Sequence, residues 1–374
     1  MGLLSFYFRK LIKIFRSEVL VLPSRVAVLV FVLFILLFPI IFPEPYYFRV
    51  IVLASIFAIL AASWDLLSGF TGQMNFGHAL FFGVGAYTSA LLNLNLQIPP
   101  IASIPLGAVA AVLAGLIIGI PCLRLRGTYL ALTTLAFPII LIGLVFAFPH
   151  FTGGELGVSG LSRLADSYLG NYYIVTVVML VLVTVMWKIT DSNIGVIFHA
   201  IREDEIAVRT SGINTIRYKL LAFSMSGFFA GIAGGLYAHY MRVAGPSTLE
   251  INTSFLVVIY AVFGGIATIY GPVGSVFVLI PFLEFLRFLE HVSIPPAILS
   301  VMPDFLGKLL VNFIEILPNT RMFIFAFFIL MILLFMPDGL LPWVRDKVET
   351  ECPRCKVRNV FKRKTCRICS ADLH

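Results

Sequence analysis

The chain contains a series of apolar runs, each long enough to cross the hydrocarbon core of a membrane as an α-helix. A core of roughly 30 Å takes about 20 helical residues. Runs of this kind occupy residues 26–42, 50–67, 76–96, 98–123, 128–148, 172–189, 218–241 and 321–341. A mean hydropathy of +1.00, with 12% charged residues, lies far from the balance of a soluble globular domain. The pattern therefore predicts a polytopic membrane protein.

The backbone of a spanning segment finds no water in lipid, so only helices and closed β-barrels can cross. Uninterrupted apolar runs exclude the alternating pattern of barrel strands. A longer run, residues 255–289, is interrupted by Gly264, Gly265, Gly271 and Pro272, and it forms either two helices or a re-entrant pair. We predict an all-α, polytopic helical membrane protein of about 8–10 spans, some of them broken or re-entrant.

Lys and Arg residues are concentrated in alternate loops, which indicates the orientation of the chain. Cytoplasmic loops carry more basic residues than external loops. Most of the 27 basic residues, including Arg124 and Arg126, fall on one side if the N-terminus is cytoplasmic. We predict a multi-pass protein of the cell membrane with both termini in the cytoplasm: an N-terminal segment 1–25, a transmembrane domain 26–344 and a tail 345–374. The net charge of +8 then reflects this orientation, and no nucleic-acid partner is expected.

One apolar segment, residues 68–92, combines many glycines with polar side chains. Glycine lets helices pack closely or break, and polar groups at membrane depth face protein or a water-filled path. The pattern predicts a helix that is interrupted near GQMNFGH and resumes through FFGVGAY. The break either lines a transport pathway or is a tightly packed joint with its polar groups satisfied internally. The candidate residues are Gly69, Gly72, Gln73, Asn75, Gly77 and His78.

A second unusual segment lies between Lys188 and Lys219, on the predicted cytoplasmic side. Apolar residues at helical spacing precede a charged cluster, and Gly212 follows at a position suited to a helix C-terminus. The segment is either a helix that a partner protein grips or a solvated loop helix. On the opposite side, the glycine-rich stretch FPHFTGGELGVSGL is either a lid, a receptor contact or a simple connector.

The sequence carries no recognisable enzyme motif. It has no phosphate-binding loop of the G-x-x-x-x-G-K-[ST] type, and no nucleophile, base and orienting residue form a known motif. An intramembrane enzyme is therefore only a weak alternative, and any ATP hydrolysis would belong to another subunit. An ion-coupled secondary transporter is an alternative, since such carriers also use broken helices, but few acids lie in the apolar runs. Asp65 lies near the end of the second run, where an acid is normally suspected of function. Since it follows Trp64, the alternative is an interface position with a water or salt-bridge partner. The six histidines are scattered, and we assign them no chemistry.

Six segments, in this order, closely resemble the LivM-like permease subunits of branched-chain amino-acid ABC importers: SWDLLSGFTGQMNFGHALFFGVGAYTSALL, LRLRGTYLALTTLAF, TGGELGVSGL, AIREDEIAVRTSGINTIRYKLLAFSMSGFFAGIAGGLYAHY, VFGGIATIYGPVGSV and MPDGLLP. The resemblance runs from about residue 63 to residue 342. It implies the permease subunit of an ATP-driven, binding-protein-dependent importer. The implied partners are a second permease subunit in a heterodimer, two cytosolic ATPase subunits and an extracytoplasmic substrate-binding protein. A related ABC permease for urea or short amides is the alternative within this class.

The resemblance also implies roles for particular residues. By position, AIREDEIAVRTSGI docks the ATPase, which would be the only subunit to use ATP. The docking candidates are Arg202, Glu203, Asp204, Glu205, Ala207 and Gly212. The segment 72–85 would help to form the translocation path at the interface between the permease subunits.

The tail contains the strongest local motif of the chain. Two C-x-x-C pairs, Cys352 with Cys355 and Cys366 with Cys369, are separated by ten residues. This spacing lets two knuckles bring four thiolates around one tetrahedral zinc ion. Thiols stay reduced in the cytosol, so a metal is favoured over disulfides, the alternative being a redox pair or four free thiols. We predict a small zinc-ribbon-like tail with a structural zinc. A basic surface of the tail would contact anionic lipid or the ATPase, through Arg354, Lys356, Arg358, Lys362, Arg363, Lys364 and Arg367.

Overall fold

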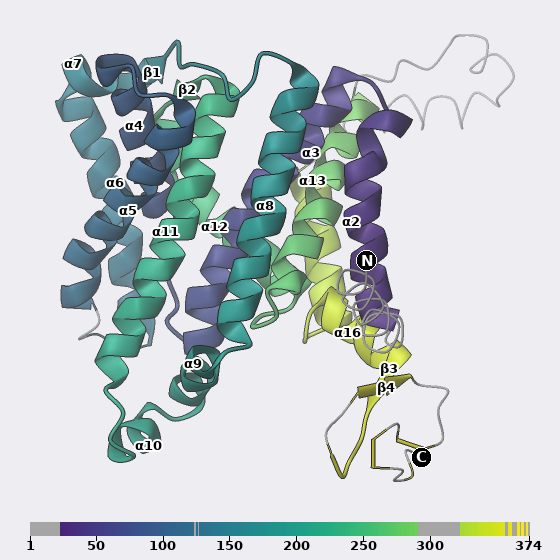
Figure 1. The fold of residues 1–374 in the computed structure, drawn as a ribbon. Coiled ribbons are helices and arrows are strands. Elements are labelled where there is room, and N and C mark those ends of the chain that lie inside the picture. The colour runs from purple at the N-terminus through teal and green to yellow at the C-terminus, as the bar shows by residue number, and fades with distance from the viewer. Residues whose placement is uncertain are drawn as a thin grey trace, which may run out of the picture. The chain divides into compact units, whose positions relative to one another are not determined.

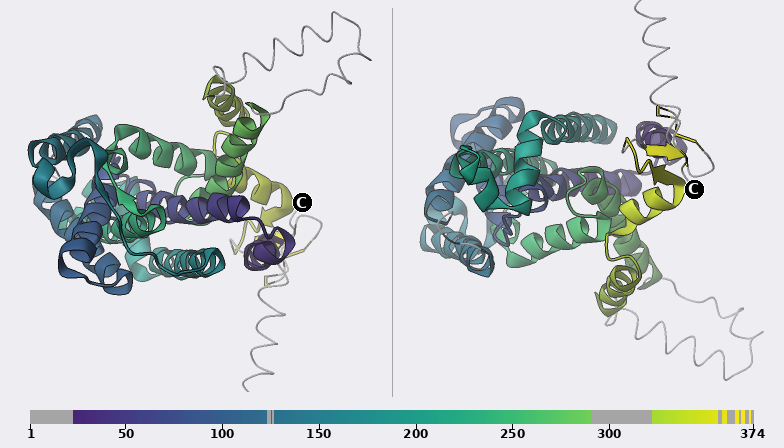
Figure 2. Two further views of the ribbon diagram at one scale, coloured as in Figure 1. Left: turned by 90° about the horizontal axis from the view of Figure 1, so that it is seen from above. Right: turned by 90° about the horizontal axis from the view of Figure 1, so that it is seen from below.

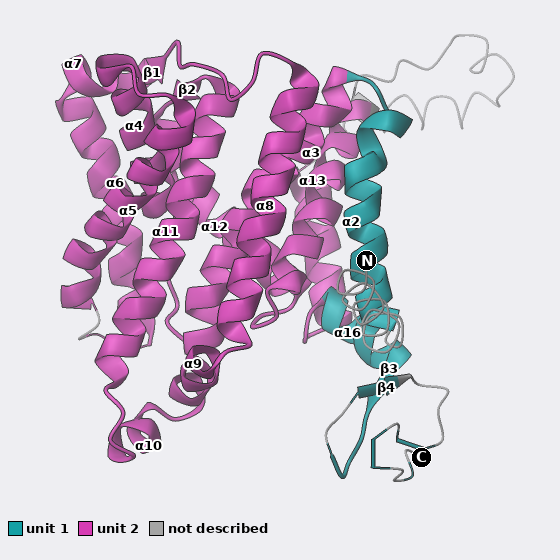
Figure 3. Ribbon diagram, viewed as in Figure 1, with its two compact units in different colours: residues 1–44, 340–374 teal, residues 45–339 magenta. Residues whose placement is uncertain are grey.

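The computed structural model describes residues 23–122, 125, 127–290, 322–355, 358–360, 365–366, 368–369 and 372. The predictions on the basic segment before residue 23, on Arg124 and Arg126, and on the tail residues Lys356, Lys362, Arg363, Lys364 and Arg367 lie outside these residues. The chain divides into two compact units, Met1–Glu44 with Leu340–His374, and Pro45–Gly339 (Figure 3).

The larger unit is a bundle of apolar helices (Figure 1). Its longer helices are α3 (Pro45–Trp64), α4 (Ala79–Leu96), α5 (Pro100–Cys122), α6 (Thr128–Ala147), α8 (Tyr168–Thr190), α11 (Thr215–Met241), α12 (Ile251–Gly264), α13 (Tyr270–Glu290) and an unlabelled helix, Met322–Phe335. Among the described residues of both units, eight helices are long and apolar enough to span a membrane, or nine if Met322–Phe335 and Leu340–Val348 form one broken span. The predicted polytopic all-α architecture is confirmed.

Helix α3 forms the centre of the larger unit. It lies between α8 on one side and α12 and α13 on the other, as both views of Figure 2 show. In the most apolar stretch of Pro45–Gly69, 89% of the residues are buried, against 22% in α8 and 28% in α6. The outer helices expose large apolar side chains, for example Ile101 and Ile117 of α5. Such faces suit lipid or another apolar subunit.

The interrupted run at 255–289 folds as two helices, α12 and α13. The chain reverses between them at Gly265, which has a φ of 111°, a value that glycine adopts readily. Ala267 and Ile269 follow with φ angles of 61° and 22°, which are rare for residues with a side chain. A Cβ atom at Gly264 would meet the carbonyl oxygen of Gly271. The two helices therefore approach at their backbones, and this contact requires glycine.

Short elements close the two ends of this bundle (Figure 1). At one end lie α7 (Pro149–Thr152), η3 (Gly154–Leu156) and β1 (Val158–Ser159), and β1 pairs in antiparallel register with β2 (Val243–Ala244). At the opposite end lie α9 (Asn193–Glu203) and α10 (Glu205–Thr210). A 3₁₀ turn, η4 (Pro246–Leu249), leads into α12. The glycine-rich stretch at 148–161 is thus paired with the chain that follows α11.

The smaller unit contains α2 (Pro23–Ile41), α16 (Leu340–Val348), β3 (Glu349–Glu351) and β4 (Arg358–Val360). The two strands are antiparallel, with Glu349 opposite Val360 and Glu351 opposite Arg358. The backbone N–H of Ser24 donates to Oε1 of Glu349 at 3.0 Å, which joins the start of α2 to β3.

Candidate functional site

The predicted interruption at GQMNFGH is present between α3 and α4. Helix α3 widens into a π-helical turn, η2 (Asp65–Gly69), and helical structure ends at Thr71. The chain then runs without regular helix until α4 begins at Ala79. Gly72 has a φ of 71°, the left-handed conformation that favours glycine. We call residues 72–78 the helix break.

Side chains from neighbouring turns satisfy the backbone of the helix break. The indole Nε1 of Trp64 donates to the carbonyl of Asn75 at 2.6 Å, and the backbone N–H of Asn75 donates to Oγ of Ser68 at 3.2 Å. The N–H of Phe76 donates to Oγ1 of Thr134 on α6, at 3.2 Å. Because unpaired backbone groups are costly in an apolar interior, these bonds fix the path of the break.

Three buried side-chain atoms of the helix break have no hydrogen-bond partner among the described residues. They are Oε1 of Gln73, Nδ2 of Asn75 and Nδ1 of His78. The other ring nitrogen of His78 lies 2.9 Å from Oγ of Ser63. Buried polar atoms normally find partners, so a group of unpaired ones indicates a place for ordered water or a solute. The break is thus a packed joint at its backbone that still offers free polar atoms.

Two glycines at this site are required by close contacts. A Cβ atom at Gly77 would meet the carbonyl oxygen of Thr134. A Cβ atom at Gly69 would meet Oδ1 of Asp65 and the backbone nitrogen of Ala267. At Gly72, by contrast, a Cβ atom would lie 3.4 Å from Cγ of Arg202, which is ordinary contact, so there it is the positive φ that favours glycine.

The structure gives Asp65 partners other than the water or salt bridge expected for an interface position. The residue is fully buried in η2. Its carboxylate accepts hydrogen bonds from the backbone N–H groups of Ala267, at 2.7 Å, and Thr268, at 3.0 Å. The partners lie more than 200 residues away in sequence, in the turn between α12 and α13, so no local pattern could have revealed them.

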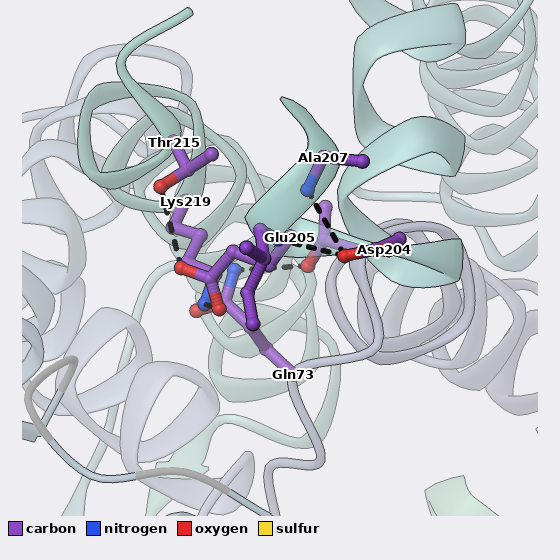
Figure 4. A network of polar contacts seen from close by, with 8 residues as sticks. Gln73, Asp204, Glu205, Ala207, Thr215 and Lys219 are labelled. Carbon is purple, nitrogen blue, oxygen red and sulfur yellow. Dashed lines mark hydrogen bonds and ion pairs between the residues drawn. The ribbon is translucent and has the colours of Figure 1, made fainter. Parts of the chain in front are cut away.

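The segment with the docking candidates forms two short helices whose ends are capped by its own polar residues. Oδ1 of Asp204 accepts from the N–H groups of Ile206, at 2.8 Å, and Ala207, at 3.0 Å, which starts α10 (Figure 4). Glu205 forms an ion pair of 2.7 Å with Lys219 at the beginning of α11. Asp204 and Glu205 therefore hold the local fold of the segment.

The other docking candidates lie in different surroundings. Glu203 and Ala207 are exposed, and Gly212 has a φ of 84° just after α10, as its predicted place at the helix end requires. Arg202 is also exposed along part of its length, but its Nη1 donates to the carbonyl of Gly69 at 2.8 Å. The structure thus joins one docking candidate to the edge of the helix break.

A buried polar cluster at the other end of the bundle was not found by sequence reasoning. Nε2 of His239 lies 3.0 Å from Oγ of Ser89 and 3.1 Å from Oγ of Ser103, and its Nδ1 lies 2.9 Å from the carbonyl of Ser162. Nδ2 of Asn93 donates to Oγ of Ser162, and Oδ1 of Asn93 accepts from the backbone N–H of Ser162. The cluster ties the chain after β1 to α4, α5 and α11. These residues are far apart in sequence and follow no motif.

The four tail cysteines come together. Sγ of Cys352 lies 3.5 Å from Sγ of Cys369, Sγ of Cys355 lies 3.5 Å from Sγ of Cys366, and all four sulfur atoms are within 4.8 Å of one another. These separations are too long for disulfides. Four ligands at about 2.3 Å from a tetrahedral zinc ion stand roughly 3.8 Å apart, so the cluster fits such an ion.

Backbone N–H groups point at two of these sulfur atoms. Hydrogen bonds from the N–H groups of Cys369 and Ile368 lower the pKa of Cys366 to about 6, and the N–H of Cys355 lowers the pKa of Cys352. Such N–H donors stabilise the thiolate, the form that binds metal. Nδ2 of Asn359, on β4, adds a contact of 3.6 Å to Sγ of Cys366.

Residues 46–334 match the family described as "Branched-chain amino acid transport system / permease component". The chain belongs to this family. The permease is 28% identical over 330 residues to the high-affinity branched-chain amino acid transport system permease protein LivM of Salmonella typhimurium, which covers 80% of this chain and 71% of the relative. It is 28% identical over 326 residues to LivM of Escherichia coli, with 79% and 70% covered. It is 25% identical over 236 residues to a probable LivH permease protein of Methanocaldococcus jannaschii, with 59% and 74% covered. No solved structure matches the permease. The resemblance to LivM-like permeases is confirmed.

Proposed function

We propose that the chain is a membrane-spanning subunit through which branched-chain amino acids enter the cell, in an ABC importer driven by separate ATPase subunits. The family match over residues 46–334 carries this proposal. The helix break between α3 and α4, with its three unpaired side-chain atoms, supports a transport role for the same region. The sequence has no ATP-binding loop, so hydrolysis belongs to a partner.

The partners follow from this role. They are a second permease subunit in a heterodimer, two ATPase subunits on the cytoplasmic side and a substrate-binding protein outside. The exposed apolar faces of α5 and α6 suit lipid or the second permease subunit. The α9–α10 end of the bundle is assigned to the cytoplasm, because basic residues accumulate there, for example Lys188, Arg209 and Lys219. We also propose that both chain termini lie in the cytoplasm, because most of the basic residues of the sequence then fall on that side.

Reconstitution tests the proposed function directly. We expect proteoliposomes that contain this chain, its permease partner, the ATPases and the binding protein to take up labelled leucine or valine only when ATP is present inside. Uptake driven by an ion gradient without ATP would contradict the proposal in favour of a secondary carrier. Uptake of urea or a short amide, without branched-chain amino acids, would instead favour the alternative ABC permease.

We assign the translocation path to the helix break and its flanks, with Gly69, Gly72, Gln73, Asn75, Gly77 and His78. Three of these residues supply the unpaired polar atoms, Gln73, Asn75 and His78. The glycines allow the contacts that hold the break in place. A permease that receives its substrate from a binding protein needs a polar path, and it does not need a tight site of its own.

We assign ATPase docking to the surface of α9 and α10. Helix α9 buries Phe198 and Ile201 against its own chain, so its opposite face is available to a partner. Glu203, Ile206 and Ala207 form the exposed part of this docking surface. Asp204, Glu205 and Gly212 contribute by shaping the segment, through the cap, the ion pair and the helix end described above.

Reversing the charge of Glu203 tests this assignment. Glu203→Lys is expected to reduce co-purification of the ATPases by about tenfold or more, because a misplaced charge at an interface costs several kcal/mol. Glu203 is better suited than Glu205, whose ion pair with Lys219 would also be broken. The control is Glu155→Lys in η3, at the opposite end of the bundle, which should leave association unchanged. Equal association of both variants would show that Glu203 does not lie at the interface.

We also propose a structural, non-catalytic zinc ion held by Cys352, Cys355, Cys366 and Cys369. The sulfur separations and the N–H donors to Cys352 and Cys366 support it. Such an ion contributes the folding energy that a segment too short for a hydrophobic core lacks. The strand pair β3–β4 would be the platform for the two knuckles.

A further inference from the structure

The π-helical turn at the end of α3 is a point where three distant segments of the chain meet. A π turn leaves the regular hydrogen-bond pattern of a helix and is often found at functional sites. In η2 the carbonyl of Gly69 accepts a hydrogen bond of 2.8 Å from Nη1 of Arg202, which lies 133 residues further along the chain, near the end of α9. Thus α9 is attached directly to the last turn of α3.

The same turn also holds the junction between α12 and α13. The Asp65 carboxylate accepts from the N–H groups of Ala267 and Thr268, at 2.7 and 3.0 Å. These bonds stabilise a backbone whose positive φ angles at Ala267 and Ile269 are otherwise unfavourable. A Cβ atom at Gly69 would meet both Asp65 and Ala267. The Arg202 contact and the Asp65 contact are therefore separated by a single tightly packed residue.

Further contacts make the attachment of α9 firm. The position of a Cβ atom at Gly72 lies 3.4 to 3.7 Å from the backbone and side chain of Arg202, so the start of the helix break rests on this residue. One turn earlier on α9, the ring of His199 packs edge-on against Phe70, with ring centroids 4.9 Å apart. Burial lowers the pKa of His199, which favours the neutral ring in this contact. Residues 69–72 are thus held from one side by α9.

We propose that Arg202 and Asp65 are positioning residues of a coupling relay, in which a displacement of α9 by the ATPase moves Gly69 and, through Asp65, the α12–α13 junction. The relay rests on the proposed function, since it requires an ATPase at α9. Helix α3 is packed on all sides, whereas the two segments next to the turn, 72–78 and 265–269, are non-helical and can change their dihedral angles. A movement of Arg202 would therefore change the backbone conformation of the helix break, 72–78, and of the α12–α13 junction, 265–269, at the same time.

The relay predicts that Arg202 affects transport per ATP and not assembly. In Arg202→Gln the cationic donor to Gly69 is lost, and we expect the number of substrate molecules transported per ATP hydrolysed to fall roughly tenfold. Co-purification with the ATPases should match wild type, unlike the result expected for Glu203→Lys. Arg202→Lys keeps a cation that can reach a carbonyl and should recover most of the ratio. Arg163→Gln, in the chain after β1 and outside the docking surface of α9 and α10, is the control and should leave the ratio unchanged.

Asp65→Asn tests the second step of the relay. The N–H groups of Ala267 and Thr268 bond different oxygens of the carboxylate. In asparagine one of these oxygens is replaced by an NH2 group, so one of the two N–H groups would face a donor. Its transport ratio should fall as in Arg202→Gln, and the double variant should be no worse than the single ones, because residues in one pathway are not additive.

Three outcomes would overturn the relay. They are an unchanged ratio in Arg202→Gln, additive losses in the double variant, or loss of ATPase binding in both Arg202 variants, which would make Arg202 a docking residue. Absence of ATP-driven uptake in the wild type would instead count against the proposed function, so the two failures are distinguishable.

Discussion

Gly77→Ala is expected to reduce amino-acid uptake strongly while the protein remains in the membrane. The added methyl group would meet the backbone carbonyl of Thr134 on α6, which cannot rotate away as a side chain could. The N–H of Gly77 is bound to Oδ1 of Asn75 at 2.9 Å, so the break cannot shift without losing this bond. Overpacking of this kind costs about 1–3 kcal/mol or more. Uptake into reconstituted vesicles, measured at equal protein content, should fall about tenfold or more.

The chain offers a matched control for this variant. Gly143 lies on the same helix as Thr134, and a Cβ atom there would meet nothing within 4 Å. Gly143→Ala adds the same methyl group and should leave uptake unchanged, with a slight gain in helix stability of about 0.5–1 kcal/mol. Gly107 is unsuitable, although it lies in an uninterrupted span, because a Cβ atom there would meet the carbonyl of Gly85. Equal uptake by the two alanine variants would remove the special role of the helix break.

Replacing Cys352 and Cys355 together with serine is expected to abolish zinc binding by the tail. Two of the four sulfur ligands disappear, and zinc contributes about 10–16 kcal/mol to the folding of small structural zinc domains. Elemental analysis of the purified chain should find one zinc ion in the wild type and none in the variant. Limited trypsin digestion should then cleave the tail much faster. Uptake should persist, because the cysteines lie in a different compact unit from the helix break.

Cys122→Ser is the control for the zinc prediction. Cys122 is a buried residue at the end of α5 and belongs to the larger unit, whereas the cysteine cluster belongs to the smaller unit. The Cys122→Ser variant should therefore keep one zinc ion. A wild-type chain without metal but with a protease-resistant tail would refute the zinc site. Loss of uptake in the cysteine pair variant, with the permease intact, would show that the tail takes part in transport.

If the proposed docking and relay are correct, α9 separates assembly from coupling. Glu203 is exposed and free to meet a partner, while the adjacent Arg202 reaches back to Gly69. Two neighbouring residues of one short helix are thus assigned different steps, one to binding the ATPase and one to transmitting its movement. The contrast between their variants measures both steps with the same purified complex.

The sequence alone determined the membrane helices, the place of the helix break and the cysteine cluster. Each depends on local chemistry. An apolar run in lipid must form its own backbone hydrogen bonds as a helix, and glycines with polar neighbours interrupt that helix. Two C-x-x-C pairs close in sequence can come together over a short connecting segment. The family resemblance rested on motifs in the same linear order. The helix end near Gly212 was also predicted from a single residue, because glycine is favoured just after a helix.

Only the tertiary structure decided which distant residues meet. The sequence did not reveal the partners of Asp65, because Ala267 and Thr268 belong to a turn more than 200 residues away. The bond from Arg202 to Gly69 and the cluster around His239 arise in the same way, from helices that pack against each other. A hydrophobic pattern specifies that a helix is buried, but it does not specify which polar atom faces which neighbour. That choice is made by the packing of the whole bundle, since a buried polar group must take whatever partner the adjacent helices supply.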